Sequence, residues 1–175
     1  DCGWGRLIFA QTFTDQAPLM KTIRQEAADE RDIVFYVQNP QVLVSLAPHE
    51  VFLDPSLTFR LWLSRYRPHK ERPRGYFVRR LETKGDAAAV NRLYARAKMV
   101  SVPMDFLVRN RNSRRLTYLL AEDEATGAII GTVTGVDHRF AFNDPEKGAS
   151  LWSLSVDPQA SFPGVGEALV RTLAE

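Results

Sequence analysis

The chain has 175 residues, of which 45% are hydrophobic, and its 23 basic and 21 acidic side chains leave a formal charge of +2. This composition is typical of a globular protein with enough chain for one or two domains. The balanced charge argues against nucleic acid as the main partner, because such domains usually carry a basic face. No apolar run reaches membrane-spanning length, and no signal-peptide pattern is present. We therefore expect a cytoplasmic protein without a membrane partner.

The cysteine content and the chain ends add two expectations. Cys2 is the only cysteine, so the sequence predicts neither a disulfide framework nor a cysteine-based zinc site, and no metal site is expected. The chain begins at Asp1 and ends at Glu175 inside a helical pattern. We expect it to be part of a longer protein.

The first unit, residues 1–66, shows alternating strand and helix patterns typical of a small α/β unit. Strands are predicted at residues 6–13, 33–37 and, in two pieces, 51–53 with 57–63. Helices are predicted from a cap at Thr14 or Asp15, with Leu19, Ile23 and Ala27 on one face, and again after Asn39 and Pro40. No motif in this unit indicates catalysis.

A basic stretch follows the first unit. Its cations, set against the single acid Glu71, are Arg65, Arg67, Lys70, Arg72, Arg74, Arg79 and Arg80. Residues 67–75 within it carry two prolines, and we interpret them as a solvated linker. The alternative is a patch whose arginines meet phosphate or a carboxylate substrate.

The second unit, residues 76–175, shows a longer series of elements. Strands are predicted at residues 76–81, 116–121, 128–136 and 150–156, with Gly127 taking a positive φ in the hairpin turn. Helices are predicted from Asp86 as the cap, with Val90, Leu93, Tyr94 and Ala97 on one face, over residues 102–110, and over residues 164–175, with Val165, Leu169, Val170 and Leu173 on one face. Residues 143–148 read as a polar loop.

Two glycines, Gly164 and Gly166, lie between the strand at residues 150–156 and the last helix. The first turn of a helix has free backbone N–H groups and partial positive charge, so it attracts anions. Glycine lets a phosphate approach the backbone closely. The pattern therefore indicates an anion site, although two glycines also serve loops that only turn.

The order strand, helix, helix, hairpin, strand, glycine loop and helix resembles the front half of the GNAT superfamily of acyl-CoA N-acyltransferases. The most specific part is the spacing of Val156 and Pro158 before Gly164-Val165-Gly166. The resemblance implies an α/β (α+β) fold with a mixed, mostly antiparallel sheet flanked by helices and incomplete at its C-terminal end. It also implies acetyl-CoA as co-substrate and a small amine as acceptor.

The resemblance assigns cofactor-binding roles to two segments. The main chain of Leu154, Ser155 and Val156 would pair with the pantetheine arm, and an amide in the same segment would stabilise the oxyanion. The pyrophosphate would meet the loop and helix start at Ser161, Gly164, Val165, Gly166 and Glu167. The loop departs from the family pattern at Ser161, where Arg or Gln is usual, at Phe162, where Gly is common, and at Pro163, which lacks an N–H. A degenerate loop that binds nothing is the alternative.

Acyl transfer also needs a group that deprotonates the amine. Many family members use a carboxylate on the strand before the loop, and this chain has Trp152 there. Asp137 and His138, at the end of the hairpin strand, are the nearest titratable pair, and we predict them as the catalytic residues. A merely solvated strand-end pair is the alternative.

A closer resemblance covers the whole chain. Four segments are similar to the N-terminal part of the bacterial N-acetylglutaminylglutamine synthetase family. They are DCGWGRLIFAQTF, FLDPSLTFRLWLSRYRP, AEDEATGAIIGTVTGVDH and SLWSLSVDPQ. In that family an acetyltransferase-like region precedes an ATP-grasp ligase, which implies glutamine or glutaminylglutamine as acceptor and a C-terminal ATP-grasp partner domain. The alternatives are a non-catalytic domain that binds a ligand or positions the ligase, and a nucleotide-binding module. The last is disfavoured because the loop has no Gly-Lys-Ser/Thr ending.

Overall fold

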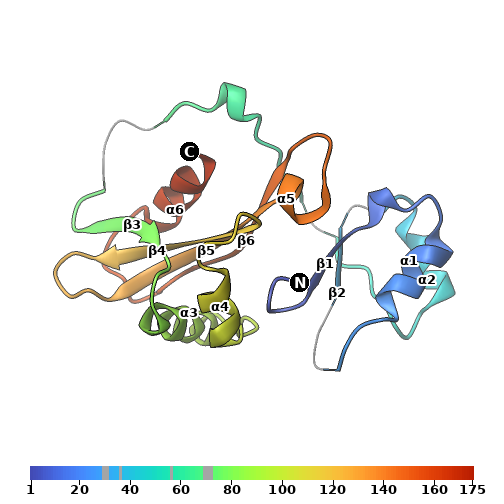
Figure 1. Cartoon of the computed structure of the whole chain (residues 1–175), viewed down its shortest axis with the longest axis horizontal. Helices are drawn as coiled ribbons and strands as arrows, with labels where there is room; N and C mark the ends of the chain where they lie inside the picture. The colour runs from blue at the N-terminus through green and yellow to red at the C-terminus, as the bar shows by residue number, and fades with distance from the viewer. Residues whose placement is uncertain (29–31, 36, 56, 69–72) are drawn as a thin grey trace. The chain divides into compact units, whose positions relative to one another are not determined.

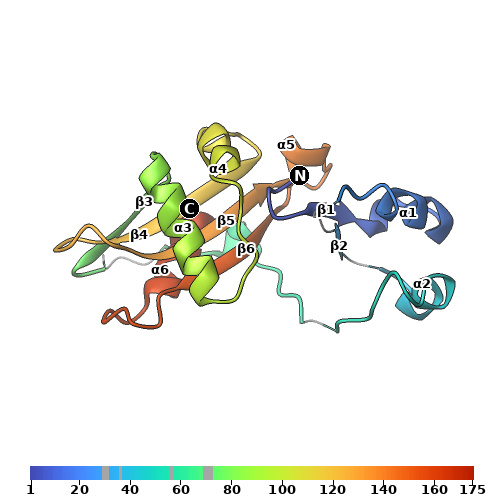
Figure 2. The same cartoon turned by 90° about the horizontal axis from the view of Figure 1, so that it is seen from below.

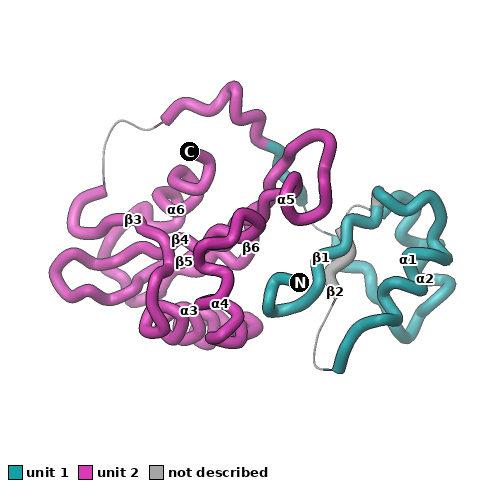
Figure 3. Tube along the Cα trace, viewed as in Figure 1, with its two compact units in different colours: residues 1–60 teal, residues 61–175 magenta. Residues whose placement is uncertain are grey.

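The computed structural model describes residues 1–28, 32–35, 37–55, 57–68 and 73–175. Contacts along the backbone divide the chain into two units, residues 1–60 and 61–175 (Figure 3). Residues 61–66, which the sequence assigns to the first unit, have their contacts with the second. Part of the expected linker, residues 69–72, lies outside the described residues. None of the helices in the described ranges is long and apolar enough to cross a membrane.

The first unit is a parallel strand pair with helices. β1 (Arg6–Phe9) pairs with β2 (Asp32–Phe35), and α1 (Gln16–Ile23) and α2 (Pro40–Leu46) follow the two strands (Figure 1). Its core consists of Ile8, Ala10, Leu19, Met20, Ile23, Leu43 and Ala47. The first predicted strand is shorter than expected, because the chain turns into the 3-10 helix η1 (Ala10–Thr12).

Local capping in the first unit agrees in part with the sequence. The Asp15 carboxylate caps α1 by accepting a hydrogen bond of 3.3 Å from the Ala17 N–H. The helix ends at Ile23, so Ala27 does not extend its apolar face. Asn39 precedes α2 in the left-handed conformation, and Pro40 takes the first helical position, where its missing N–H costs nothing.

The predicted strand at residues 51–53 and 57–63 is wrong. The described residues of this segment form no strand, and only a short 3-10 helix, η2 (Leu63–Arg65), follows. Phe52, Leu57 and Phe59 are 85–88% exposed. An apolar run becomes a strand only where its N–H and C=O groups find a neighbouring strand, and the described residues offer this segment none.

The second unit is a four-stranded antiparallel sheet between helices, as the resemblance implies. The strands β3 (Tyr76–Arg80), β4 (Leu116–Asp123), β5 (Ile129–Asp137) and β6 (Ala149–Val156) lie in this order across the sheet. α3 (Lys84–Arg96) and α4 (Met104–Asn110) cover one face, and α6 (Val165–Ala174) covers the other (Figures 1 and 2). The positive φ of 69° at Gly127 confirms the predicted hairpin turn. The sequence did not predict α5 (His138–Phe142), which follows β5 directly.

Two glycines of β5 let α6 lie close against the sheet. A Cβ atom at Gly131 would lie 2.9 Å from Cγ1 of Val165, and one at Gly135 would lie 2.6 Å from Cδ1 of Leu173. Both distances are too short for a real side chain. Val165 and Leu169 are buried in the core on this face, whereas Val170, expected beside them, is 36% exposed.

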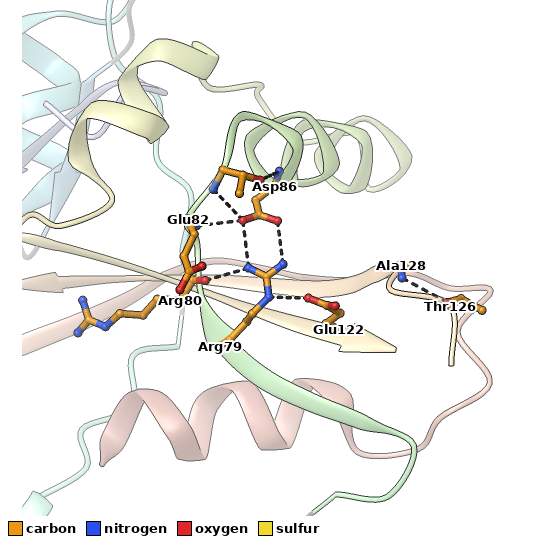
Figure 4. A network of polar contacts seen from close by, with 8 residues as sticks. Arg79, Arg80, Glu82, Asp86, Glu122, Thr126 and Ala128 are labelled. Atoms are coloured by element: carbon orange, nitrogen blue, oxygen red, sulfur yellow. Dashed lines mark hydrogen bonds and ion pairs between the residues drawn. The ribbon is translucent and has the colours of Figure 1, made fainter. Parts of the chain in front are cut away.

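The start of α3 is held by a polar cluster around Arg79, which we call the Arg79 cluster: Arg79, Asp86 and Glu122 (Figure 4). Thr83 is the cap, not Asp86 as expected. Its hydroxyl accepts from the Asp86 N–H at 3.0 Å, and the Asp86 carboxylate accepts from the Thr83 N–H at 2.9 Å. The Arg79 guanidinium lies 2.8 Å from Asp86 and also contacts Glu122. Arg79 therefore belongs to the fold and not to a solvated stretch.

Within the Arg79 cluster, Arg79 and Asp86 are both held in their ionised forms. Hydrogen bonding to Asp86 raises the pKa of Arg79 above its usual value. Burial opposes ionisation of Asp86, but hydrogen bonds from Arg79 and from the Glu82 and Thr83 N–H groups outweigh it, and the pKa of Asp86 lies well below its usual range.

Candidate functional site

The edge strand β6 carries a bulge at its centre. Thr132 pairs with Ser155 and Thr134 with Trp152, so two residues of β6, Ser153 and Leu154, oppose the single residue between the two threonines. Ser153 has a φ of 51°, a left-handed conformation that non-glycine residues rarely adopt. Bulges re-aim the main chain and occur often beside functional sites. Because β6 is the last strand of the described sheet, this irregular main chain lies on an open edge.

The N-terminus of α6 lies at the end of the loop that follows β6. Gly164 is its N-cap with a φ of 77°, and no side chain caps the helix. The first intrahelical bond runs from the Ala168 N–H to the Gly164 carbonyl at 2.9 Å. The N–H groups of Val165, Gly166 and Glu167 therefore lie in an uncapped first turn, where the helix dipole adds partial positive charge.

Phe162 anchors the loop between β6 and α6. Its ring packs on Tyr76 with 5.5 Å between ring centroids, and the absent side chain of Gly75 makes room for it, since a Cβ there would lie 2.5 Å from the ring. The Tyr76 hydroxyl donates to the Pro163 carbonyl at 3.4 Å. Phe162, one of the departures from the family pattern, thus packs against the core and fixes the position of the loop.

An open groove of about 440 Å³ connects β6 with α6. It is lined by Leu61, Tyr66, Leu154, Gly166, Glu167, Val170, Arg171 and Ala174. Its volume lies within the range of small-molecule sites. Its walls are largely aliphatic, and near its charged end the Glu167 carboxylate pairs with Arg171, 2.7 Å from Nη2. The groove can thus take an apolar chain beside β6 and a polar group at the helix start.

The groove brings together three of the eight predicted cofactor-binding residues: Leu154, Gly166 and Glu167. The side chains of Val156 and Val165 pack into the core instead, so only their main chain could meet a ligand. Ser155 is also buried, and its hydroxyl has no hydrogen-bond partner among the described residues. Ser161 is exposed in the loop, and Gly164 forms the cap.

The two predicted catalytic residues have different surroundings. Asp137 is the N-cap of α5: its carboxylate accepts from the Phe140 N–H at 3.2 Å and lies 3.9 Å from the Arg139 guanidinium. His138 points toward β6, where its Nε2 lies 2.7 Å from Oγ of Ser150. The imidazole is therefore hydrogen-bonded to a serine, and the Asp137 carboxylate caps α5.

A second carboxylate lies beside His138. Oδ2 of Asp144 is 3.7 Å from Nδ1 of His138, an ion-pair distance beyond hydrogen-bond length. The Trp152 indole N–H donates to Oγ of Ser150 at 2.7 Å. We call this group, Asp144, His138, Ser150 and Trp152, the His138 cluster. Burial lowers the pKa of His138, and Asp144 and Asp137 oppose that shift, so the imidazole is neutral at pH 7.

Sequence reasoning missed Ser150 and Asp144 in this cluster, and Tyr66 and Arg171 in the groove. The spacing of Glu167 and Arg171 could have revealed their pairing, because residues four apart on a helix are neighbours. Nothing local marks Ser150, since it meets His138 only when β5 and β6 pair. Asp144 lies in the turn after α5, where its N–H donates to the His138 carbonyl at 3.3 Å. Within the described ranges, no group of three or more His, Cys, Asp or Glu side chains is placed to hold a metal ion.

No family model and no curated protein matches the chain. Solved structures similar to it include a Drosophila protein, at 21% identity over 59% of this chain and 30% of that one, with a TM-score of 0.43. An acetyltransferase from Trypanosoma brucei matches at 20% identity over 56% of this chain and 71% of that one, with a TM-score of 0.44.

A third similar structure is a GNAT family acetyltransferase from Brucella melitensis in complex with acetyl-CoA. It matches at 20% identity over 55% of this chain and 64% of that one, with a TM-score of 0.39. The match thus spans less than two thirds of the Drosophila and Brucella chains. At these identities and TM-scores, the likeness assigns no activity or ligand to this chain.

Proposed function

We propose that this chain provides an acyl-CoA N-acyltransferase region that transfers an acetyl group from acetyl-CoA to a small primary amine. One observation carries the proposal: the groove joins the bulged open edge of β6 to the uncapped first turn of α6. An acyl-CoA needs both features, because its pantetheine arm is a long chain with amide groups and its other end carries phosphates. The resemblance of residues 76–175 to the GNAT superfamily supports the same assignment.

The residues of the groove suit the two parts of acetyl-CoA. The pantetheine amides would pair with the β6 edge at Leu154, whose side chain lines the groove with Val170. The pyrophosphate would meet the N–H groups of the first α6 turn, where Gly166 presents no side chain. An amide at residues 154–156 would stabilise the oxyanion that forms on the thioester.

The acceptor is the finer part of the proposal. From the closer sequence resemblance, we propose the α-amino group of glutamine or glutaminylglutamine, in a protein whose C-terminal part is an ATP-grasp ligase. The test measures thiol release from acetyl-CoA with these acceptors, alongside spermidine, aminoglycosides and lysine peptides. Faster release with any of the latter would leave the acyltransferase proposal standing and overturn this acceptor.

Glycine substitutions in α6 test the cofactor site. A Cβ at Gly166 would lie 3.6 Å from Cγ2 of Val156, which is an ordinary contact, so the fold accepts Gly166→Ala. Gly166→Val should weaken CoA binding about tenfold or more, because a branched side chain pushes the phosphates away from the backbone. Calorimetric titration with CoA and dephospho-CoA should show equal losses if the contact is to the pyrophosphate.

Gly85→Val is the matched control, because Gly85 holds the second helical position of α3, as Gly166 does in α6. It should leave CoA affinity unchanged. Glu167→Gln should keep or raise the affinity, since it removes a negative charge and releases Arg171 from its ion pair. Undiminished CoA affinity in folded Gly166→Val would show that the loop is only a turn.

A second candidate function is a non-catalytic GNAT-like domain that positions a neighbouring ligase. The loop supports it, because Pro163 has no N–H to offer and its carbonyl already accepts from Tyr76. The same titration distinguishes the two functions, since the non-catalytic domain should bind neither CoA nor dephospho-CoA through the α6 turn.

A further inference from the structure

We propose that Ser150, His138 and Asp144 form a proton relay that deprotonates the acceptor amine, with Ser150 as its outer member. The inference deepens the proposed acyltransferase function and rests on it. The proposed relay rests on the hydrogen bond between His138 and Ser150. Because this contact occupies Nε2, a proton reaches the imidazole through the serine hydroxyl.

The hydrogen-bond donors and acceptors define the direction of the relay. Asp144 lies beside Nδ1 of His138 and favours an N–H there, which leaves Nε2 as an acceptor. The Trp152 N–H can only donate, so the Ser150 oxygen accepts from it. The Ser150 hydroxyl proton is then free to point at Nε2, 2.7 Å away. The Ser150 hydroxyl, the His138 imidazole and the Asp144 carboxylate thus follow one another in the order that acid–base catalysis requires: hydroxyl, base and orienting carboxylate.

The charges around the imidazole suit a base. Asp144 from the loop and Asp137 from the end of β5 favour its protonated form. β6, which packs against it, contributes no titratable side chain, since residues 149–156 read ASLWSLSV. The imidazole thus starts neutral and becomes an imidazolium between two carboxylates once it takes a proton.

The cluster is not needed to close the loop after α5. The Asp144 carboxylate already accepts from the Gly148 N–H at 2.8 Å and from the Glu146 N–H at 3.1 Å. These bonds hold residues 143–148 without the imidazole. The contact from His138 to Ser150 therefore has a use beyond loop closure.

The ammonium form of the acceptor loses one N–H proton to the Ser150 oxygen through a chain of bridging waters, while the Ser150 proton moves to Nε2 of His138. The freed nitrogen lone pair attacks the thioester carbonyl, and the C–N bond forms. As the C–S bond breaks, the nitrogen loses its second N–H proton and the leaving thiolate takes up one proton, both through solvent. The imidazolium of His138 then returns its proton to solvent for the next turnover. More than one water is required because Ser150 lies three residues from the bulge at Ser153, about 10 Å along a strand.

The test follows kcat/KM for acetyl transfer from pH 6 to 9.5, with the best acceptor of the thiol-release panel. Ser150→Ala should lower it roughly 10- to 100-fold at pH 7, and the deficit should shrink toward pH 9.5. At high pH the α-amino group, with a pKa of about 8, is already neutral and needs no relay. A structural role would lower activity equally at every pH.

Asp144→Asn gives a second, directional readout. Losing the carboxylate charge lowers the pKa of His138, so the acid limb of the pH profile should move to lower pH while the maximum falls. Ser101→Ala, an exposed serine of the same unit, is the control and should leave the profile unchanged. CoA affinity should be unaffected in all three variants.

The outcomes separate this inference from the proposed function. Normal activity of Ser150→Ala, a loss that is equal at all pH values, or a loss of CoA affinity would overturn the relay and leave the acyltransferase standing. A wild-type protein that releases no thiol with any acceptor would overturn both.

Discussion

The second unit contains two polar clusters that look alike in composition and differ in what they can do. In the Arg79 cluster, a guanidinium contacts two carboxylates, and hydrogen bonds keep Arg79 and Asp86 ionised against the effect of burial (Figure 4). In the His138 cluster, a carboxylate lies at 3.7 Å and the strong contact is to a neutral hydroxyl. In the Arg79 cluster the charged groups pair with one another, whereas in the His138 cluster a hydroxyl proton can move to the imidazole.

The difference teaches how to separate a structural ion pair from a candidate site. Arg79 and Asp86 have pKa values shifted away from neutrality, each stabilised by the other, so neither exchanges protons at physiological pH. Burial lowers the pKa of His138, and two nearby carboxylates oppose that shift, so the imidazole is neutral at pH 7 and can accept a proton. Position also differs, because the Arg79 cluster joins β3 and β4 to α3, and the His138 cluster lies at the open edge strand.

The largest expected effect is on stability, from Asp86→Ala. This change leaves Arg79 without its main partner and removes one half of the α3 capping box. We expect the free energy of unfolding to fall by about 3 kcal/mol, measured by urea denaturation. Lys84→Ala, an exposed neighbour in the same turn, should change it by less than about 0.5 kcal/mol. A similarly small loss for Asp86→Ala would contradict the structural role of the Arg79 cluster.

The next effect is the stability cost of breaking the His138 cluster. Ser150→Ala removes two side-chain hydrogen bonds on an edge strand, with His138 and with Trp152, and we expect a loss of about 1 to 2 kcal/mol. The same urea denaturation measures it. A loss as large as that of Asp86→Ala would contradict the comparison, because the cluster would then be holding the fold together.

The smallest effect separates the clusters by pH. The folded-state pKa of His138 is lowered, so the unfolded chain binds the extra proton, and stability should fall as pH drops through about 6.5. The folded-state pKa of Asp86 is also lowered, and its contribution should be lost only below about pH 4. His138→Gln should flatten the first slope and Asp86→Asn the second, seen in urea midpoints between pH 3 and 8. A first slope unchanged by His138→Gln would contradict the lowered pKa.

Much of the second unit follows from local pattern. The strands of the sheet, the positive φ at Gly127 and the helix after Gly164 are as predicted, because alternation, turn residues and helical spacing act within a few residues. The exposed segment around Phe59 shows the limit of such reasoning. Its apolar pattern suits a strand, but a strand also needs a neighbour, which local sequence does not supply.

The sequence by itself determined the order of the four strands of the second unit with α3, α4 and α6, and the glycines at the start of α6. Only the tertiary structure decided that Ser150 is the hydrogen-bonded neighbour of the imidazole. It also decided that Phe162 belongs to the core. The physical reason is the same each time: a cap or a turn forms between residues a few positions apart, whereas strand register and helix packing bring distant residues within hydrogen-bond reach.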